Sequence, residues 1–259
     1  MKLKGIFLVL LLVAVTAGVV LTLVFLRPKT CERVEVRLQF TGNDTLLTSG
    51  EVLGILKEKG IQLVGIAPGK LRRVEIENAL RTNVWFDSLL NLTPVGNTLR
   101  MEVRVKSPLL AVYPANGFPY FIGNNGELLP DNSRVHSQLP VLNGNITTPY
   151  TPNKNVRDLK EAALHDAYKI ALAVKADTLF ADQLTQFYVN DDSEIEAYNA
   201  LARHSVLFGH SDNLEQKLQQ LHIVYDEALI YMPADTYSKV DVRFKNRVFA
   251  TRKIITNIL

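Results

Sequence analysis

The chain has 259 residues, of which 47% are hydrophobic and 21% are charged, and its formal net charge at pH 7 is +3. This balance is ordinary for a packed globular protein and excludes a largely disordered chain. Basic residues are interspersed with acidic ones, so the sequence does not predict a nucleic-acid-binding surface. The single cysteine, Cys31, excludes an internal disulfide framework and fits a bacterial envelope protein.

An uncharged apolar run extends from Gly5 to Leu26. A helix of this length is about 33 Å long at about 1.5 Å per residue, which is enough to cross a hydrocarbon core of about 30 Å. We therefore predict a membrane-spanning helix over residues 5–26, preceded by a cytoplasmic tail over residues 1–4. A cleaved signal peptide is the alternative, with Val15-Thr16-Ala17 as its cleavage site, but the apolar run continues beyond that site.

The charges that flank this run are nearly balanced and do not fix its orientation. An N-terminal signal-anchor usually exports the chain that follows it, so we expect residues 27–259 to lie outside the cytoplasm. About 230 residues follow the run, which is enough for one large domain or two small ones.

A small α+β domain with the order β-α-α-β-β is predicted over residues 32–105. Three segments have the apolar pattern of strands, at residues 34–40, 84–92 and 99–105. Two segments have apolar residues at helical spacing, at residues 49–60 and 71–83. Thr48 or Ser49 is expected to cap the first helix, and Gly60 is expected to end it. Val74 is expected on the apolar side of the second helix, and both helices on one face of a three-stranded sheet.

A larger α+β domain, mostly sheet, is predicted over residues 106–259. Short extended segments are expected at residues 109–113, 120–122, 139–142, 187–189, 195–201, 206–209, 240–244 and 248–250. Helices are expected at residues 159–174, 179–183 and 214–225. Asn213 is expected to cap the last of these helices.

No motif in the sequence predicts an enzyme. The histidines do not form HExxH or another familiar metal-ligand spacing, and no GxSxG motif occurs. His204 and His210 flank an apolar segment, and we expect surface or strand-end histidines there rather than a metal pair. The acidic residues 191–196 are expected to be solvated rather than to supply a hydrolytic carboxylate pair. We therefore predict no catalytic residue, no metal and no cofactor.

Two stretches of the sequence resemble the FtsQ/DivIB family of bacterial cell-division proteins. Residues 101–108 and 120–130 are similar to the passage from the family's membrane-proximal domain into its β domain, and Leu139-Pro140-Val141-Leu142-Asn143-Gly144 matches its Leu-Pro-x-Leu-x-Gly pattern. Residues 237–248 are similar to the family's C-terminal Ile-Asp-Leu-Arg-Tyr-x-Asn-x-Val strand. The chain departs from that pattern at Phe244, where Tyr is usual. With Lys217, Leu218, Leu221 and Tyr225 before it, this stretch resembles that of Bacteroidetes-type members.

The resemblance implies a non-enzymatic scaffold of the cell-division machinery. The β-α-α-β-β domain would be a POTRA-like domain that contributes to recruitment, and the second domain an FtsQ-type β domain with a C-terminal edge strand. The implied partners are the small bitopic proteins FtsB and FtsL, and the FtsW–FtsI synthase of septal peptidoglycan. The implied location is the bacterial inner membrane at the division septum, with a single span, a cytoplasmic N-terminus and a periplasmic body.

A partner-binding site follows from the same resemblance. Arg243 matches a family arginine that meets an acidic partner residue, and Phe244 matches an aromatic anchor. An exposed edge strand can accept a strand from a partner. The partner-binding residues that we predict are Tyr237, Val240, Val242, Arg243, Phe244 and Val248. The alternative is that Val242 and Phe244 are core residues of a terminal strand. We expect Arg243→Glu to weaken binding and to leave the thermal midpoint almost unchanged.

Two other classes of protein remain open. One is another POTRA-bearing envelope assembly or secretion protein, and the other is an anchored periplasmic hydrolase. Three Asn-x-Ser/Thr sites, at Asn43, Asn91 and Asn145, keep a eukaryotic glycoprotein as a minor alternative.

Overall fold

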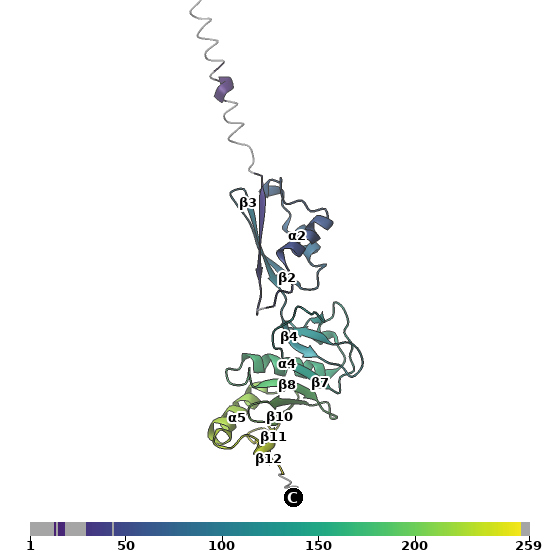
Figure 1. Cartoon of the computed structure of the whole chain (residues 1–259), viewed down its shortest axis with the longest axis vertical. Helices are drawn as coiled ribbons and strands as arrows, with labels where there is room; N and C mark the ends of the chain where they lie inside the picture. The colour runs from purple at the N-terminus through teal and green to yellow at the C-terminus, as the bar shows by residue number, and fades with distance from the viewer. Residues whose placement is uncertain (1–12, 14, 19–29, 43, 255–259) are drawn as a thin grey trace, which may run out of the picture. The chain divides into compact units, whose positions relative to one another are not determined.

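The structure is a computed structural model that describes residues 13, 15–18, 30–42 and 44–254 (Figure 1). The helix predicted over residues 5–26 therefore lies largely outside the described residues. Within the part of the chain that is described, no helix is both long enough and apolar enough to span a membrane. The chain divides into two compact units. One contains the residues up to Gln39 together with Leu47–Arg104, and the other contains Phe40–Leu46 and the residues from Val105 onward.

The first unit has the predicted β-α-α-β-β order. Its elements are β1 (Arg33–Gln39), α2 (Ser49–Glu58), the 3-10 helix η1 (Pro68–Lys70), α3 (Arg73–Leu80), β2 (Phe86–Val95) and β3 (Thr98–Val105). β3 lies between β1 and β2, and β1 runs parallel to it. The side chains of β3 alternate between fully buried apolar residues and more exposed polar ones, so the sheet packs its apolar face against the helices.

The predicted cap of α2 is confirmed, whereas one prediction for α3 was wrong. The Thr48 hydroxyl accepts from the Glu51 N–H at 3.2 Å, and Glu51 Oε2 accepts from the Thr48 N–H at 2.8 Å, which completes a capping box. Gly60 follows α2 with a φ of 73°, a conformation that favours glycine. Val74 is 68% exposed, because it lies about 200° around the helix from the buried Ile76.

The second unit is built on a nine-stranded mixed sheet. Its strands are β4 (Pro108–Val112), β5 (Tyr120–Gly123), β6 (Leu128–Pro130), β7 (Val141–Gly144), β8 (Leu184–Val189), β9 (Ile195–Asn199), β10 (His204–Gly209), β11 (Tyr237–Asp241) and β12 (Phe249–Arg252). Their order across the sheet is β12-β11-β10-β9-β8-β7-β4-β5-β6. The helices of this unit are α4 (Ala162–Ala176), α5 (Leu214–Glu227) and the 3-10 turns η2 (Val156–Asp158) and η3 (Leu229–Tyr231).

One apolar cluster joins α4 and α5 to this sheet. It includes Leu164 and Ile170 of α4, Leu221 of α5, and Phe187 and Phe208 of the central strands. All five side chains are at most 1% exposed. Removal of this apolar surface from water is the main contribution that stabilises the unit.

Two local predictions for the second unit were wrong. Residues 179–183 form turns rather than a helix. Asp177 Oδ1 accepts from the N–H groups of Leu179 at 2.9 Å and Phe180 at 3.0 Å, which holds the turn. Asn213 does precede α5, but its φ is 48° and its side chain donates to Asp212 at 3.1 Å instead of capping the helix. In both places a short polar side chain satisfies local groups in a non-helical geometry.

Residues Phe40–Leu46 follow β1 in the sequence but belong to the second unit. Asp44 Oδ1 accepts from the N–H groups of His136 at 2.8 Å and Ser137 at 2.9 Å. Burial acts to raise the pKa of Asp44, but the hydrogen bonds from Ser137 and His136 outweigh it and hold this pKa below its usual range. The predicted range 32–105 had assigned this segment to the first domain.

Candidate partner-binding site

The predicted partner-binding residues lie on the β11–β12 hairpin, at one end of the nine-stranded sheet (Figure 1). β11 is an inner strand, because it pairs in parallel with β10 and antiparallel with β12. β12 is the last strand of the sheet as far as the described residues extend, so it forms the edge. The strand predicted to continue through Phe244 ends at Asp241, and the chain returns as β12 after a connecting loop.

The six predicted residues divide into core and surface positions. Val240 and Val242 are 0% exposed, and Val248 packs against the same apolar cluster. The structure therefore supports the core interpretation for Val242, and both buried valines support the hairpin from within. Tyr237 is partly buried at the start of β11, and Phe244 is 47% exposed. Phe244 is not part of the core, because β11 ends at Asp241 and Phe244 lies in the loop that follows.

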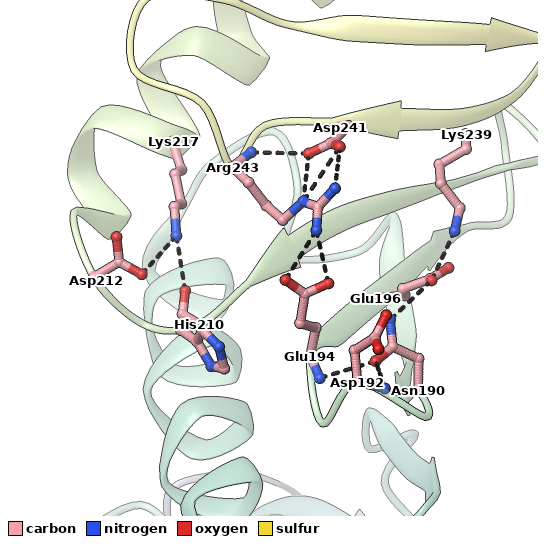
Figure 2. Close-up of polar contacts among 10 residues, drawn as sticks. All are labelled: Asn190, Asp192, Glu194, Glu196, His210, Asp212, Lys217, Lys239, Asp241 and Arg243. Carbon is pink, nitrogen blue, oxygen red and sulfur yellow. Dashed lines mark hydrogen bonds and ion pairs between the residues drawn. The ribbon is translucent and has the colours of Figure 1, made fainter.

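Arg243 is tied to two carboxylates of its own chain (Figure 2). Its Nη1 donates to both carboxylate oxygens of Glu194 at 2.9 Å, and its Nε and Nη2 donate to Asp241 at 2.7–3.2 Å. The Arg243 side chain is 35% exposed, whereas each carboxylate side chain is 15% exposed. Hydrogen bonds to Asp241, and then to Glu194, raise the pKa of Arg243 further above its ordinary value, so the guanidinium stays charged.

The backbone brings Arg243 and Glu194 together across β10. Glu194 precedes β9 in a turn in which Asn190 Oδ1 accepts from the N–H groups of Asp192 at 3.0 Å and Glu194 at 2.9 Å. Gly209, at the end of β10, has a φ of 69°, and a Cβ there would lie 2.9 Å from Cγ and Cδ of Arg243. Only a glycine leaves room for the Arg243 side chain to pass over β10 and reach Glu194.

Helix α5 fixes the loop between β11 and β12. Gln220 Nε2 donates to the carbonyl oxygens of Phe244 at 3.0 Å and Arg247 at 3.3 Å. Gln216 Nε2 donates to Asn246 Oδ1 at 3.1 Å. The loop is therefore held in place from the helix, and the position of the Phe244 side chain depends on α5.

The start of α5 is held by a buried lysine. Lys217 is 4% exposed, and its Nζ donates to the His210 carbonyl oxygen at 2.9 Å and to Asp212 Oδ1 at 3.1 Å (Figure 2). The hydrogen bond from Lys217 lowers the pKa of Asp212, which keeps the Asp212 carboxylate charged. Because α5 carries the two glutamines that hold the loop, this pair supports the hairpin indirectly.

Two aromatic rings mark the solvent side of the hairpin. Phe244 and Phe249 are 47% and 53% exposed, and their rings meet edge to face with centroids 5.3 Å apart. The Arg243 guanidinium carbon lies 5.5 Å from the Phe244 ring centroid, which is a cation–π distance. Every residue of β12 is exposed. We refer to the surface formed by Phe244 and Phe249–Arg252 as the β12 edge surface.

Basic side chains flank the β12 edge surface. Lys245 and Arg247 lie between Phe244 and Phe249 in the sequence, Arg252 is the last residue of β12, and residues 242–254 contain no Asp or Glu. Lys253 pairs with Asp235 at 2.6 Å, whereas the three other basic residues form no ion pair within the described part of the chain. The predicted short strand at residues 248–250 overlaps β12, but of this region only Val248 was predicted to bind a partner, and the exposed residues Phe249–Arg252 were not.

Within residues 30–42 and 44–254, no group of three or more His, Cys, Asp or Glu side chains is placed to hold a metal ion. His204 and His210 have separate partners, since His204 Nε2 lies 2.7 Å from Tyr225 Oη and His210 Nδ1 lies 3.0 Å from Asp166 Oδ2. Burial lowers the pKa of His204, so this imidazole is neutral near pH 7.

These observations define an α+β protein whose large mixed sheet ends, as far as the chain is described, in the exposed strand β12. A family model described as FtsQ/DivIB, C-terminal related, matches residues 107–251, which include all nine strands of that sheet almost to the end of β12. The chain belongs to this FtsQ/DivIB-related family, which suggests a role in cell division and has no known catalytic activity. A comparison with curated proteins finds no significant match.

Proposed function

We propose that this protein is a non-enzymatic scaffold of the bacterial cell-division machinery that binds a partner strand at β12. The observation that carries the proposal is the family match over a sheet whose terminal strand is exposed along its whole length. A strand at a sheet edge has unpaired backbone N–H and C=O groups that a partner strand can satisfy.

The proposed partners are FtsB- and FtsL-like bitopic proteins, and through them an FtsW/FtsI-type septal synthase. In this proposal residues 5–26 anchor the chain in the inner membrane, with residues 1–4 in the cytoplasm and the body in the periplasm at the septum. The β-α-α-β-β order of the first unit is compatible with a POTRA-like recruitment domain. A shared membrane would confine the scaffold and its partners to two dimensions and raise their effective concentration.

The β12 edge surface has the composition of a protein-binding surface. Phe244 and Phe249 supply exposed aromatic area, and aromatic residues are common energetic centres of interfaces, each worth about 2–4 kcal/mol. Lys245, Arg247 and Arg252 favour a partner segment with acidic residues. A second copy of the same strand would bring like charges together, so self-pairing is disfavoured.

Arg243 has a positioning role in this proposal. Glu194 and Asp241 already occupy its guanidinium, so a partner carboxylate meets only the exposed third of the side chain. Arg243→Glu would place a third carboxylate beside those two. The earlier expectation that this substitution leaves the thermal midpoint unchanged is therefore replaced by an expected loss of stability, and Arg243→Glu does not separate binding from folding.

Phe249→Glu is the sharper test, because Phe249 is exposed on β12 and outside the apolar cluster. We expect this variant to reduce copurification with the FtsB-like protein of the same bacterium at least tenfold, with the thermal midpoint almost unchanged. Phe118→Glu is a matched control, since Phe118 is 88% exposed and lies between β4 and β5. Equal copurification by both variants would rule out β12 as the binding edge. Hydrolysis of peptidoglycan by the purified chain would instead favour an anchored hydrolase.

A further inference from the structure

The first unit has an uncharged loop beside the start of β1. Residues 60–69, which follow Lys59 at the end of α2, are Gly-Ile-Gln-Leu-Val-Gly-Ile-Ala-Pro-Gly and contain no charged side chain. The Gly65 N–H donates to the Cys31 carbonyl oxygen at 2.7 Å, and the Cys31 N–H donates to the Ile66 carbonyl oxygen at 3.1 Å. These two hydrogen bonds hold the loop against the residues through which the chain enters β1.

The turn between β2 and β3 lies at the same end of the unit. The N–H groups of Glu32 and Arg33 donate to the Asn97 carbonyl oxygen at 2.7 Å and 3.3 Å. Glu32 Oε2 also accepts from Asn97 Nδ2 at 2.5 Å, so this carboxylate is bonded within the unit. Residues 94–97 are Pro-Val-Gly-Asn, which carry no charge. Two uncharged segments therefore meet at the end of the unit where β1 starts.

Both segments expose apolar side chains to water. Val64 is 56% exposed and Val95 is 45% exposed. Single exposed valines are common on protein surfaces, so their position relative to a membrane decides what they can do. The exposed charged residues that adjoin residues 60–69 in the sequence are mainly basic, namely Lys57, Lys59 and Lys70 against Glu58. Apolar side chains bordered by lysines suit the interface of a bilayer, where anionic headgroups attract the lysines.

The sequence keeps these loops close to the proposed membrane anchor. The apolar run ends at Leu26, and Cys31 follows only five residues later. Five residues span at most about 18 Å even when they are fully extended. The headgroup region on one side of a bilayer is itself about 5–8 Å thick. If residues 5–26 cross the membrane, the end of the unit that carries Val64 and Val95 is therefore tethered at the bilayer surface.

We propose that residues 60–69 and 94–97 rest on the bilayer that anchors the chain, with Val64 and Val95 in its interfacial region. This inference rests on the membrane anchor of the proposed function. The contact removes the two valine side chains from water, which is favourable. It also restricts the rotation of the first unit about its tether, so the unit keeps one orientation relative to the membrane surface.

Quenching by labelled lipids tests this contact in the full chain. Cys31, the only cysteine, is 1% exposed, so the unsubstituted chain should take up little thiol-reactive fluorophore. The variant Val64→Cys is labelled and reconstituted into vesicles of phosphatidylcholine and phosphatidylglycerol, with or without lipids that carry a nitroxide near the headgroup in both leaflets. The label at position 64 should lose most of its fluorescence in the nitroxide vesicles, whichever way the chain inserts. Val95→Cys is a second probe of the same contact and should lose its fluorescence as well.

Gln39→Cys is the matched control, because Gln39 is exposed at the opposite end of β1, about 20 Å along the strand from Arg33. A label there should keep its fluorescence. Extraction with alkaline carbonate shows separately whether the chain is integrated into the vesicles. An integrated chain whose labels at positions 64 and 95 are quenched no more than the label at position 39 would overturn this inference and leave the anchor in place. A chain that carbonate releases would overturn the anchor of the proposed function, and this inference with it.

Discussion

Replacing Arg243 with glutamine should destabilise the second unit, because Glu194 and Asp241 then face each other without their cation. Both carboxylate side chains are only 15% exposed. Removing one partner of a fully buried ion pair costs about 3–5 kcal/mol, whereas an exposed pair is worth about 0–1 kcal/mol. The Arg243 side chain is 35% exposed, so the free energy of unfolding should fall by an intermediate amount, about 1.5–3 kcal/mol.

Thermal unfolding followed by circular dichroism, with urea unfolding as a second measurement, tests this value. For a unit of this size the expected loss corresponds to a fall in thermal midpoint of about 3–12 °C. Arg243→Glu should lower the midpoint further, because it adds a third carboxylate to the cluster. Arg252→Gln is the control, since Arg252 is exposed on β12 and its substitution should change stability by less than about 0.5 kcal/mol.

A specific result would refute this reasoning. If Arg243→Gln and Arg252→Gln unfold at the same midpoint, the cluster with Glu194 and Asp241 does not stabilise the hairpin. The Arg243 guanidinium would then be available for direct contact with a partner, as the family resemblance first implied.

Two further predictions concern residues around the same sheet. Gly209→Ala should cost about 1–2 kcal/mol, because alanine disfavours a φ of 69° and its Cβ would lie 2.9 Å from the Arg243 side chain. If Gly209→Ala costs the same when Arg243 is also alanine, the steric part of this reasoning is wrong. Asp177→Asn should cost about 1 kcal/mol at pH 7, because Asp177 Oδ2 lies 2.7 Å from His222 Nε2. Burial acts to raise the pKa of Asp177, but hydrogen bonds from His222, Phe180 and Leu179 lower it below the ordinary value. Because the pKa of Asp177 is lower in the folded chain, its charged carboxylate stabilises the fold above about pH 4. This contribution to the free energy of unfolding is lost as the pH falls through the folded pKa. The stability difference between Asp177→Asn and the unsubstituted chain, measured by urea unfolding, should therefore shrink below about pH 4, and a constant difference would contradict the assignment.

Local sequence patterns predicted much of the fold, because many of its elements are determined by interactions between residues that are close together in the sequence. The capping box of Thr48 and Glu51 and the alternation of β3 involve residues close together in the sequence. The α+β class and the β-α-α-β-β order followed from such signals. Val74 was wrongly predicted on the buried side of α3. The residue at which the helix starts determines which side chains face the sheet, and periodicity alone does not fix that residue.

The candidate site was harder to predict because its contacts are distant in the sequence. Glu194 and Arg243 meet across β10, and only the order of strands in the sheet brings them together. Alternation correctly grouped Val240 with Val242 but could not show that the strand ends at Asp241. The alternation of residues 248–250 predicted a short strand, but it could not show that this strand, Phe249–Arg252, would form the edge of the sheet.

Amide hydrogen exchange of the full chain, with and without its FtsB-like protein, tests the central claim most directly. If a partner strand pairs with β12, the outward-facing amides within Phe249–Arg252 should exchange at least tenfold more slowly in the complex. Amides of β6, at the opposite edge of the sheet, should exchange at the same rate in both samples. A complex that forms while the exchange of the β12 amides stays unchanged would contradict the account.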